Sequence, residues 1–175
     1  RGVPRPLQEA LCRAADKEGA ALSCAEDASL RARVAELVAE GDRRQFADAH
    51  FRRELAAWIH GARKHDGMPA YALGLRSLLD MATPLVGMVV RTFDIGSGVA
   101  ASHRRIAEGS PLLLCLSTSM DNAESWICAG QALQRVLLMA AGEGYAVSFL
   151  NQPIEVAALR AELAASKKHS GNSSK

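Results

Sequence analysis

The polar pair Asn151–Gln152 is the first candidate for chemistry in this sequence of 175 residues. It follows a long run of helix-compatible residues that ends at Gly144, and Pro153 comes directly after it. Proline is well suited to the first turn of a helix, so the pair should occupy an exposed turn between two elements. Two interpretations stay open: a simple helix-entry turn, or a turn that contacts a ligand.

The other candidate sites are weaker. His60, His65 and Asp66 are residue types that bind metals, but a turn separates them and no third ligand is indicated nearby, so we predict no metal site. The stretch Gly96–Ser97–Gly98 lacks the rest of a phosphate-binding loop and favours a flexible turn. There is no G-x-S-x-G elbow. The residues alone therefore assign no catalytic side chain.

Several further polar and aromatic residues receive structural interpretations. His50 and His103 stand alone in polar surroundings and are predicted to be surface residues. The run Asp42–Arg43–Arg44 is predicted to be a solvated helix face. Trp58 and Trp126 are predicted to belong to the core, the commoner place for a large aromatic side chain.

Composition indicates a globular protein without a nucleic-acid or membrane partner. The net charge is +2, with 23% charged and 49% hydrophobic residues. Basic residues are scattered rather than gathered in a stripe, which argues against nucleic acid. No apolar run is long enough for a membrane span. Four cysteines without a CxxC pair predict reduced, mostly buried thiols and a cytoplasmic protein.

The pattern of elements predicts the α+β class, with one domain over 1–164 and a disordered tail over 165–175. We expect a small mixed sheet flanked by helices around a long central helix. A helix is expected to end near Thr83, and a flexible connection is expected over 94–110. The main predicted helices cover 7–19, 26–45, 46–64, 121–143 and 153–165, and the strands 20–24, 111–118 and 145–150. Gly19 is expected to close the first of these helices, Asp27 to cap the second, and Gly144 to end the fourth.

Two local features concern the helix over 121–143. Asp121 and Glu124 have the spacing of a capping box. Gly130, inside the helix, costs about 1 kcal/mol relative to alanine, so we expect something to pack very close to it. The short run 111–118 lacks alternation, which predicts a strand buried on both faces.

The sequence from Pro111 onward resembles the nitroreductase family of flavoproteins. The matching residues are Pro111–Thr118, Asp121, Trp126, Ala129–Leu133, Leu137–Ala141, Gly144 and Leu150–Pro153. Residues 3–163 as a whole resemble the C-terminal half of the Acg-type nitroreductase-like proteins of actinobacteria, so the chain is expected to be the second half of a longer protein. The resemblance implies a nitroreductase-like fold, and it implies that the backbone of Asn151 and Gln152 approaches the flavin ring.

The implied function is that of an FMN-dependent oxidoreductase. Electrons would pass from NAD(P)H through FMN to a nitroaromatic or quinone-like acceptor, and the flavin itself carries this chemistry. The resemblance also implies a homodimer or pairing with a related half, through the face that carries Ala129 and Gly130. A module that serves assembly alone is a further alternative.

The sequence departs from the family at the flavin phosphate. The N-terminal arginine-rich motif that binds the phosphate in the family is missing, since Arg1 and Arg5 are out of register with it. Residues 15–20 stand in place of the Pro-Ser…Asn…Gln-Pro-Trp segment of the catalytic members. A dianionic phosphate needs several donors. The departure favours an alternative function: a non-catalytic relative that binds or sequesters flavin or another small molecule.

Overall fold

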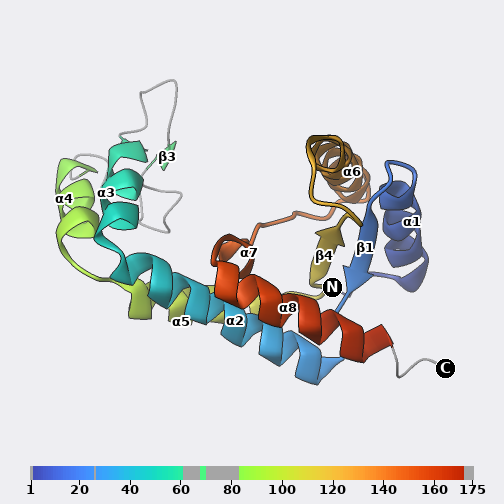
Figure 1. The fold of residues 1–175 in the computed structure, drawn as a ribbon, viewed down its shortest axis with the longest axis horizontal. Coiled ribbons are helices and arrows are strands. Elements are labelled where there is room, and N and C mark those ends of the chain that lie inside the picture. Colours follow the sequence, from blue (N-terminus) through green and yellow to red (C-terminus); the bar gives the residue numbers. More distant parts are fainter. Residues whose placement is uncertain (1, 26, 61–67, 70–82, 172–175) are drawn as a thin grey trace.

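The computed structural model describes residues 2–25, 27–60, 68–69 and 83–171 (Figure 1). Helices dominate this part of the chain, and β1 pairs with β4 in a two-stranded antiparallel sheet. The α+β class is compatible with this content. The elements are α1 (Arg5–Asp16), β1 (Ala21–Cys24), α2 (Ala28–Ala47), α3 (Ala49–Trp58), β2 (Ile59–His60), β3 (Met68–Pro69), α4 (Thr83–Thr92), α5 (Gly96–Gly109), β4 (Leu114–Ser117), α6 (Ala123–Gly142), α7 (Gln152–Glu155) and α8 (Ala157–Gly171).

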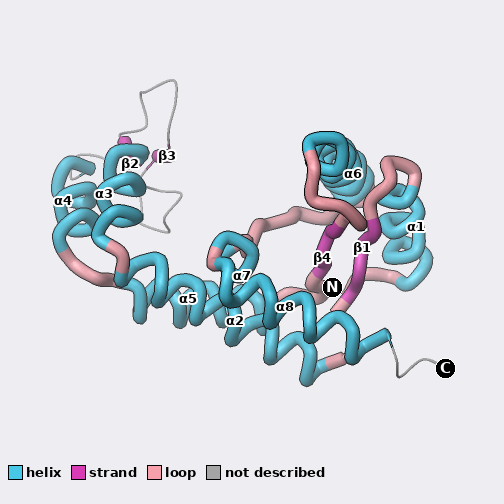
Figure 2. Tube along the Cα trace, viewed as in Figure 1, coloured by secondary structure: helices cyan, strands magenta, loops and turns pink. Residues whose placement is uncertain are grey.

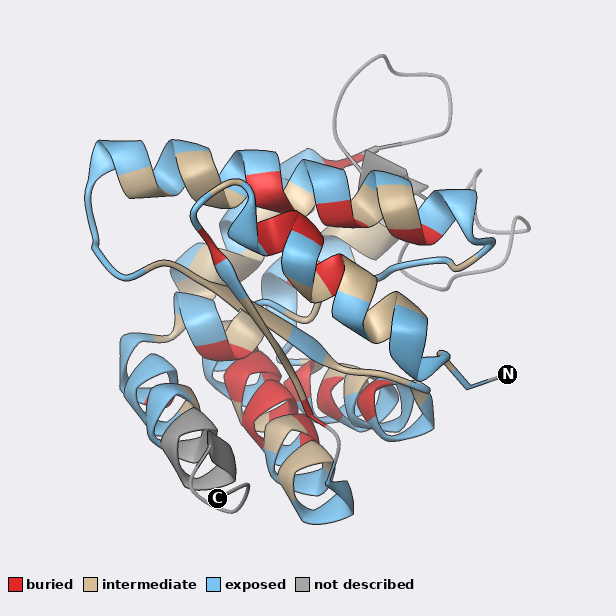
Figure 3. Cartoon of the chain, turned by 90° about the vertical axis from the view of Figure 1, so that its right-hand side faces the viewer, coloured by how far each residue is buried: buried red, intermediate tan, exposed pale blue. Residues whose placement is uncertain are grey.

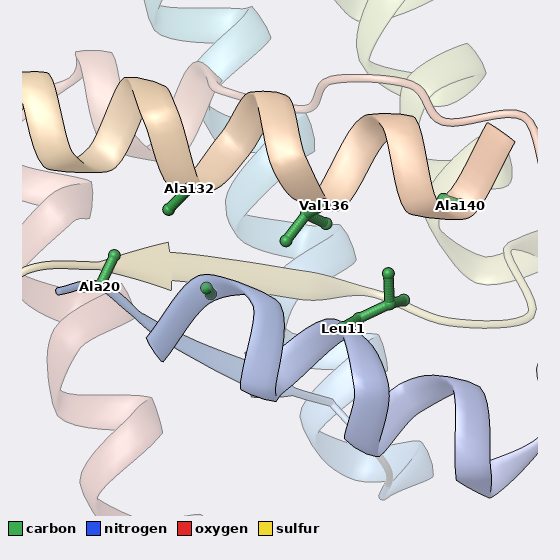
Figure 4. Close-up of a cluster of buried hydrophobic side chains, with 6 residues drawn as sticks. Leu11, Ala20, Ala132, Val136 and Ala140 are labelled. Carbon is green, nitrogen blue, oxygen red and sulfur yellow. The ribbon is translucent and has the colours of Figure 1, made fainter. Parts of the chain in front are cut away.

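At one end of the molecule, α1 and α6 pack together against the sheet (Figures 1 and 4). The register pairs Ala21 with Ser117 and Cys24 with Leu114. The buried residues between the elements are mostly small, which lets the two helices approach closely. They are Leu11, Ala15, Ala20, Ala132, Val136 and Ala140.

The centre of the molecule is built on α2, with α5, α7 and α8 packed against it (Figure 1). Two glycines make this packing possible. A Cβ at Gly41 would lie 2.6 Å from the Cβ of Gln152, and a Cβ at Gly96 would lie 2.7 Å from the Cβ of Phe46. The helix predicted to be central, α6, instead lies over the sheet at one end. Buried residues line the helix faces that turn toward their neighbours (Figure 3).

At the other end, α3 and α4 pack around the end of α2. Phe46, Ile59 and Val90 form a second buried cluster, and the rings of Phe46 and Phe51 meet edge to face with centroids 5.4 Å apart. β2 and β3 form a short parallel pair beside them. This cluster is separate from the one beneath α6.

Several local predictions are confirmed. β1 forms where the strand over 20–24 was expected, and Asp27 caps α2 by accepting a hydrogen bond from the backbone N–H of Leu30 at 3.2 Å. Gly19 and Gly144 both adopt a positive φ, of 75° and 76°. Glycine favours this conformation because it has no Cβ, and it ends the helices before both positions.

Two predictions about the middle of the chain are wrong. Residues 94–110 are not a flexible connection, because Gly96–Gly109 forms α5. Small residues at helical spacing, Gly96, Ala100 and Ala107, are buried there. The helix end expected near Thr83 is also wrong, because residues Thr83–Thr92 are helical as α4. The residues expected to form the helix before Thr83 lie outside the described part of the chain.

The strand predictions after residue 110 are wrong in two respects. β4 is not buried on both faces: the side chain of Leu114 is exposed and the other three residues of the strand are only half-buried. Residues 145–150 form no strand and cross from α6 to α7 as a loop (Figure 2). An isolated extended segment has no neighbouring strand to pair its backbone groups.

The capping box and the tryptophan positions are also corrected. Asn122, not Asp121, caps α6, by accepting a hydrogen bond from the backbone N–H of Ser125 at 2.9 Å. Asp121 accepts instead from the indole N–H of Trp126 at 2.7 Å. Trp126 is 64% exposed and Trp58 is 55% exposed, so neither belongs to the core.

The remaining helix boundaries differ in detail. Asp48 interrupts the helix predicted over 46–64, by capping α3 through the N–H of His50 at 2.8 Å. The predicted final helix is divided at Val156 into α7 and α8, and α8 reaches Gly171. The remaining tail residues, 172–175, lie outside the described residues. No helix in the described ranges combines the length and apolar character of a membrane span.

Candidate functional site

A cavity of about 580 Å³ lies between the sheet and the central helices. Its walls come from α1, both strands of the sheet, α2, α5, the buried side of α6, the 145–151 loop, α7 and α8. Most lining residues are leucine, valine, isoleucine or phenylalanine; they include Leu11, Leu22, Val34, Leu116, Val136, Leu137, Phe149, Ile154 and Leu163. The size falls within the range of small-molecule sites in proteins.

The polar lining of the cavity is sparse and uncharged. None of the described residues lining it is Asp, Glu, Lys, Arg or His, and its hydroxyl and amide side chains come from Ser23, Ser110, Tyr145, Ser148 and Asn151. The hydroxyl of Tyr145 donates to the backbone carbonyl of Gly2 at 3.0 Å. An ionised guest would lose its hydration here without gaining a charged partner, which costs several kcal/mol. The cavity therefore suits an uncharged, mainly apolar guest.

Asn151 lies on the cavity wall, as a ligand-contacting turn requires. It is the residue before α7, and its backbone carbonyl accepts hydrogen bonds from the N–H groups of Ile154 at 2.8 Å and Glu155 at 3.1 Å. Its side chain does not cap α7. The helix-entry interpretation and the ligand-contact interpretation are thus compatible for this residue.

Gln152 contacts a different part of the molecule and is not among the cavity-lining residues. Its side-chain Nε2 donates to Oδ1 of Asp42 at 3.2 Å and lies 3.0 Å from Nδ1 of His103. The amide oxygen Oε1 is buried without a hydrogen-bond partner. The structure therefore separates the two residues that the sequence suggested would act together.

Asp42 and His103 form a partly buried ion pair. Nδ1 of His103 lies 2.9 Å from Oδ2 of Asp42, and Asp42 is only 2% exposed. The hydrogen bond to the Asp42 carboxylate raises the pKa of His103 above its ordinary value, and partial burial opposes this only in part. We call Asp42, His103 and Gln152 the α2–α5–α7 cluster, after the helices that supply them.

Sequence reasoning missed this cluster. It placed Asp42 on a solvated face and His103 on the surface, and the first of these is wrong. The missed signal is helical spacing: Asp42 falls in line with Ala35, Val38 and Phe46, all buried. A charged residue within such an apolar stripe indicates a buried partner.

The remaining candidates are not brought together. Gly96 begins α5 and packs on α2, so Gly96–Ser97–Gly98 is a helix start rather than a loop. His65 and Asp66 lie outside the described residues, as does the side chain of His60. No set of three or more potential metal ligands gathers within the part of the chain that the structure describes. His50 lies near Arg53 on the exposed side of α3.

Comparisons with known protein families, curated proteins and solved structures found no match for this chain. The function of this chain is therefore inferred from the cavity and from the resemblance described above.

The cofactor implied by that resemblance fits the cavity only in part. The apolar walls suit a flavin ring, but a phosphate needs cationic or multiple N–H donors. The described cavity wall supplies no arginine or lysine. Arg5 is exposed on α1, where it pairs with Glu9 at 3.7 Å, and Arg1 lies outside the described residues. This cavity alone does not fit the phosphate of FMN.

Proposed function

We propose that this chain binds an uncharged, mainly apolar small molecule in the cavity between the sheet and α2. The observation that carries the proposal is the cavity of about 580 Å³, whose described lining is largely apolar and contains no charged side chain. Burial of apolar surface supplies about 25 cal/mol per Å². The few polar groups at the wall, such as Asn151 and Tyr145, orient the guest.

The class of guest follows from this lining. A planar ring system with one or two polar edge atoms matches an apolar space with a polar rim better than a phosphate ester does. Quinone-like molecules and phosphate-free flavin rings belong to this class. In this proposal the chain binds or sequesters the molecule, and no side chain of the cavity wall is assigned a proton-transfer role.

An FMN-dependent oxidoreductase is the second candidate. It is favoured by the position of Asn151, which lies on the cavity wall where the resemblance to nitroreductases implies a flavin contact. Bound FMN would supply hydride and electron transfer, with NAD(P)H as donor. This candidate needs phosphate donors beyond the described cavity wall, for example from a second copy of the chain.

A comparison of three ligands distinguishes the candidates. Riboflavin, FMN and the uncharged probe N-phenyl-1-naphthylamine are titrated into the purified protein, with fluorescence as the readout. The binding proposal predicts that the probe binds and that riboflavin binds at least as tightly as FMN. A yellow purified protein that prefers FMN and oxidises NAD(P)H would support the oxidoreductase instead. If none of the three binds, the binding proposal is wrong.

We further propose that the chain pairs with a second copy through α6. Its exposed face, formed by Ile127, Gly130, Gln134 and Leu138, carries two apolar residues that are 64% and 63% exposed. Apart from the backbone of its own helix and its chain neighbours, no described atom lies within 4 Å of a Cβ placed at Gly130. The described residues therefore do not supply the close packing expected at Gly130, and a partner helix would supply it.

A further inference from the structure

Asp42 is the one fully buried charged residue in the described part of the chain, and both of its hydrogen-bond partners come from other helices. His103 belongs to α5 and Gln152 to α7, at sequence separations of 61 and 110 residues. Burying a carboxylate is costly unless it is paired and hydrogen-bonded. The cluster therefore holds α7 against α2 and α5.

The tautomer of His103 follows from the chemistry of its partner, because an ionised carboxylate only accepts hydrogen bonds. Oδ2 of Asp42 is an acceptor, so Nδ1 of His103, 2.9 Å away, must carry a proton. Nε2 of Gln152 also donates to Asp42, and its contact with Nδ1 at 3.0 Å is then between two donors. Both bonds converge on the Asp42 carboxylate. A second proton, on Nε2 of His103, makes the ring a cation and compensates the buried charge.

The backbone of α7 is closely fitted to the same place. A Cβ at Gly41 would lie 2.6 Å from the Cβ of Gln152 and 3.0 Å from its carbonyl carbon. Pro153, next in the chain, is almost completely buried. Asn151, the preceding residue, lies on the cavity wall. A displacement of α7 would therefore move the polar edge of the cavity.

The other charged groups around the cluster are occupied elsewhere. On α2, Glu36 pairs with Arg43 at 2.8 Å and with Arg104 of α5 at 3.1 Å. On α7, Glu155 accepts from Gln45 of α2 at 2.5 Å. On α8, Arg160 donates to the backbone carbonyl of Ile154 in α7 at 2.7 Å. Asp42 is thus the titratable group in contact with His103 among the described residues.

We propose that Asp42 and His103 are positioning residues for the cavity: the Asp42 carboxylate fixes α7 through Gln152, and a doubly protonated His103 compensates the charge of this carboxylate while α7 keeps it buried. The effect on a guest rests on the proposed function, but the hold on α7 does not. The raised pKa of His103 supports the direction. Because the pKa of His103 is higher in the folded state, the stabilisation that its protonation contributes is complete below the ordinary histidine pKa of about 6.5. This stabilisation is lost as the pH rises through the pKa of His103 in the folded state.

Hydrogen exchange at α7 measures this hold directly. The reporters are the amides of Ile154, Glu155 and Val156, which bond to the carbonyls of Asn151 and Gln152. After correction for intrinsic rates, we expect about tenfold faster exchange at about pH 9 than at about pH 5.5, because the Asp42 carboxylate is then buried without a compensating cation although the bond from Nδ1 of His103 remains. No change in protection between the two pH values would overturn the proposal.

Variants separate the cluster from a merely structural effect. His103→Gln and Asp42→Asn are expected to abolish the pH dependence of α7 protection, whereas His50→Gln, at an exposed histidine, should retain it. Gly41→Ala should lower protection at both pH values, because it displaces α7 without removing a titratable group. Retention of the full pH response in His103→Gln would contradict the inference.

A measurement on the unaltered chain covers the case in which these variants fail to fold. The imidazole resonances of His103 should titrate with the same midpoint as the backbone amide shifts of α7, and different midpoints would refute the coupling. N-phenyl-1-naphthylamine binding is then followed over the same pH range. Coupled exchange without probe binding would support the positioning role and reject the proposed function alone.

Discussion

Replacing Leu138 by glutamate tests whether α6 provides the surface for a second copy. Leu138 is 63% exposed in the single chain. Complete burial of a leucine side chain is worth about 1.5–3 kcal/mol, so covering its exposed part contributes roughly 1–2 kcal/mol per copy. A two-fold symmetric interface counts the residue twice, which gives about 2–4 kcal/mol. Leu138→Glu should therefore weaken self-association by about 30-fold to several hundred-fold.

Sedimentation velocity over a concentration series measures this change. The matched control is Ala101→Glu, which makes the same change in charge at an exposed position of α5. The control should self-associate like the unaltered chain, and circular dichroism should show both variants to be equally helical. If the unaltered chain remains monomeric at high concentration, or if Leu138→Glu associates normally, α6 is not the interface.

Four further outcomes are expected. Leu159→Ala should lower the free energy of unfolding by about 2–5 kcal/mol in urea denaturation, because Leu159 is only 1% exposed and the change leaves a void; a loss below about 1 kcal/mol would contradict its packing. Asn122→Ala should lower the free energy of unfolding by about 1 kcal/mol through loss of the α6 cap. Asp121→Ala should lower it less, because the Asp121 carboxylate bonds only the exposed Trp126. A larger loss for Asp121→Ala than for Asn122→Ala would instead support Asp121 as the cap. The free energy of unfolding, measured between about pH 5.5 and about pH 9, should lose the contribution of His103 as pH rises through its folded pKa, and His103→Gln should remove that part of the dependence. A guest that fills the cavity should tighten self-association, because Leu137 lines the cavity from α6, the helix proposed to pair with a second copy. Thermodynamic linkage then requires self-association to raise the guest affinity by the same factor. A guest affinity that does not depend on protein concentration would exclude the coupling.

The features predicted correctly from sequence are those with local causes. The Asp27 cap depends on an N–H group three residues away, and Gly144 depends on its own backbone angle. Such signals act within one turn and need no knowledge of the rest of the chain. They are sufficient to place helix ends, which is why α2 and α6 lie close to their predicted ranges.

The errors arise where a distant element decides the outcome. Residues 145–150 have strand-forming side chains, but no neighbouring strand is available, so they cross the cavity as a loop. Residues 96–109 contain three glycines and were expected to be flexible, yet the small residues are what allow α5 to lie against α2. Composition indicates what a segment prefers, whereas packing decides whether that preference is used.

The candidate site illustrates the same limit at single residues. Asn151 and Gln152 are adjacent and similar in chemistry, so the sequence gives no reason to treat them differently. In the fold, Asn151 lies on an apolar cavity and Gln152 donates to a carboxylate 110 residues earlier. The difference is made by Asp42, a charge within an apolar helix face that must find partners when it is buried. A buried charge in a predicted apolar stripe is thus a stronger indication of where distant elements pack together than an exposed polar pair, because only the buried charge obliges those elements to supply it with partners.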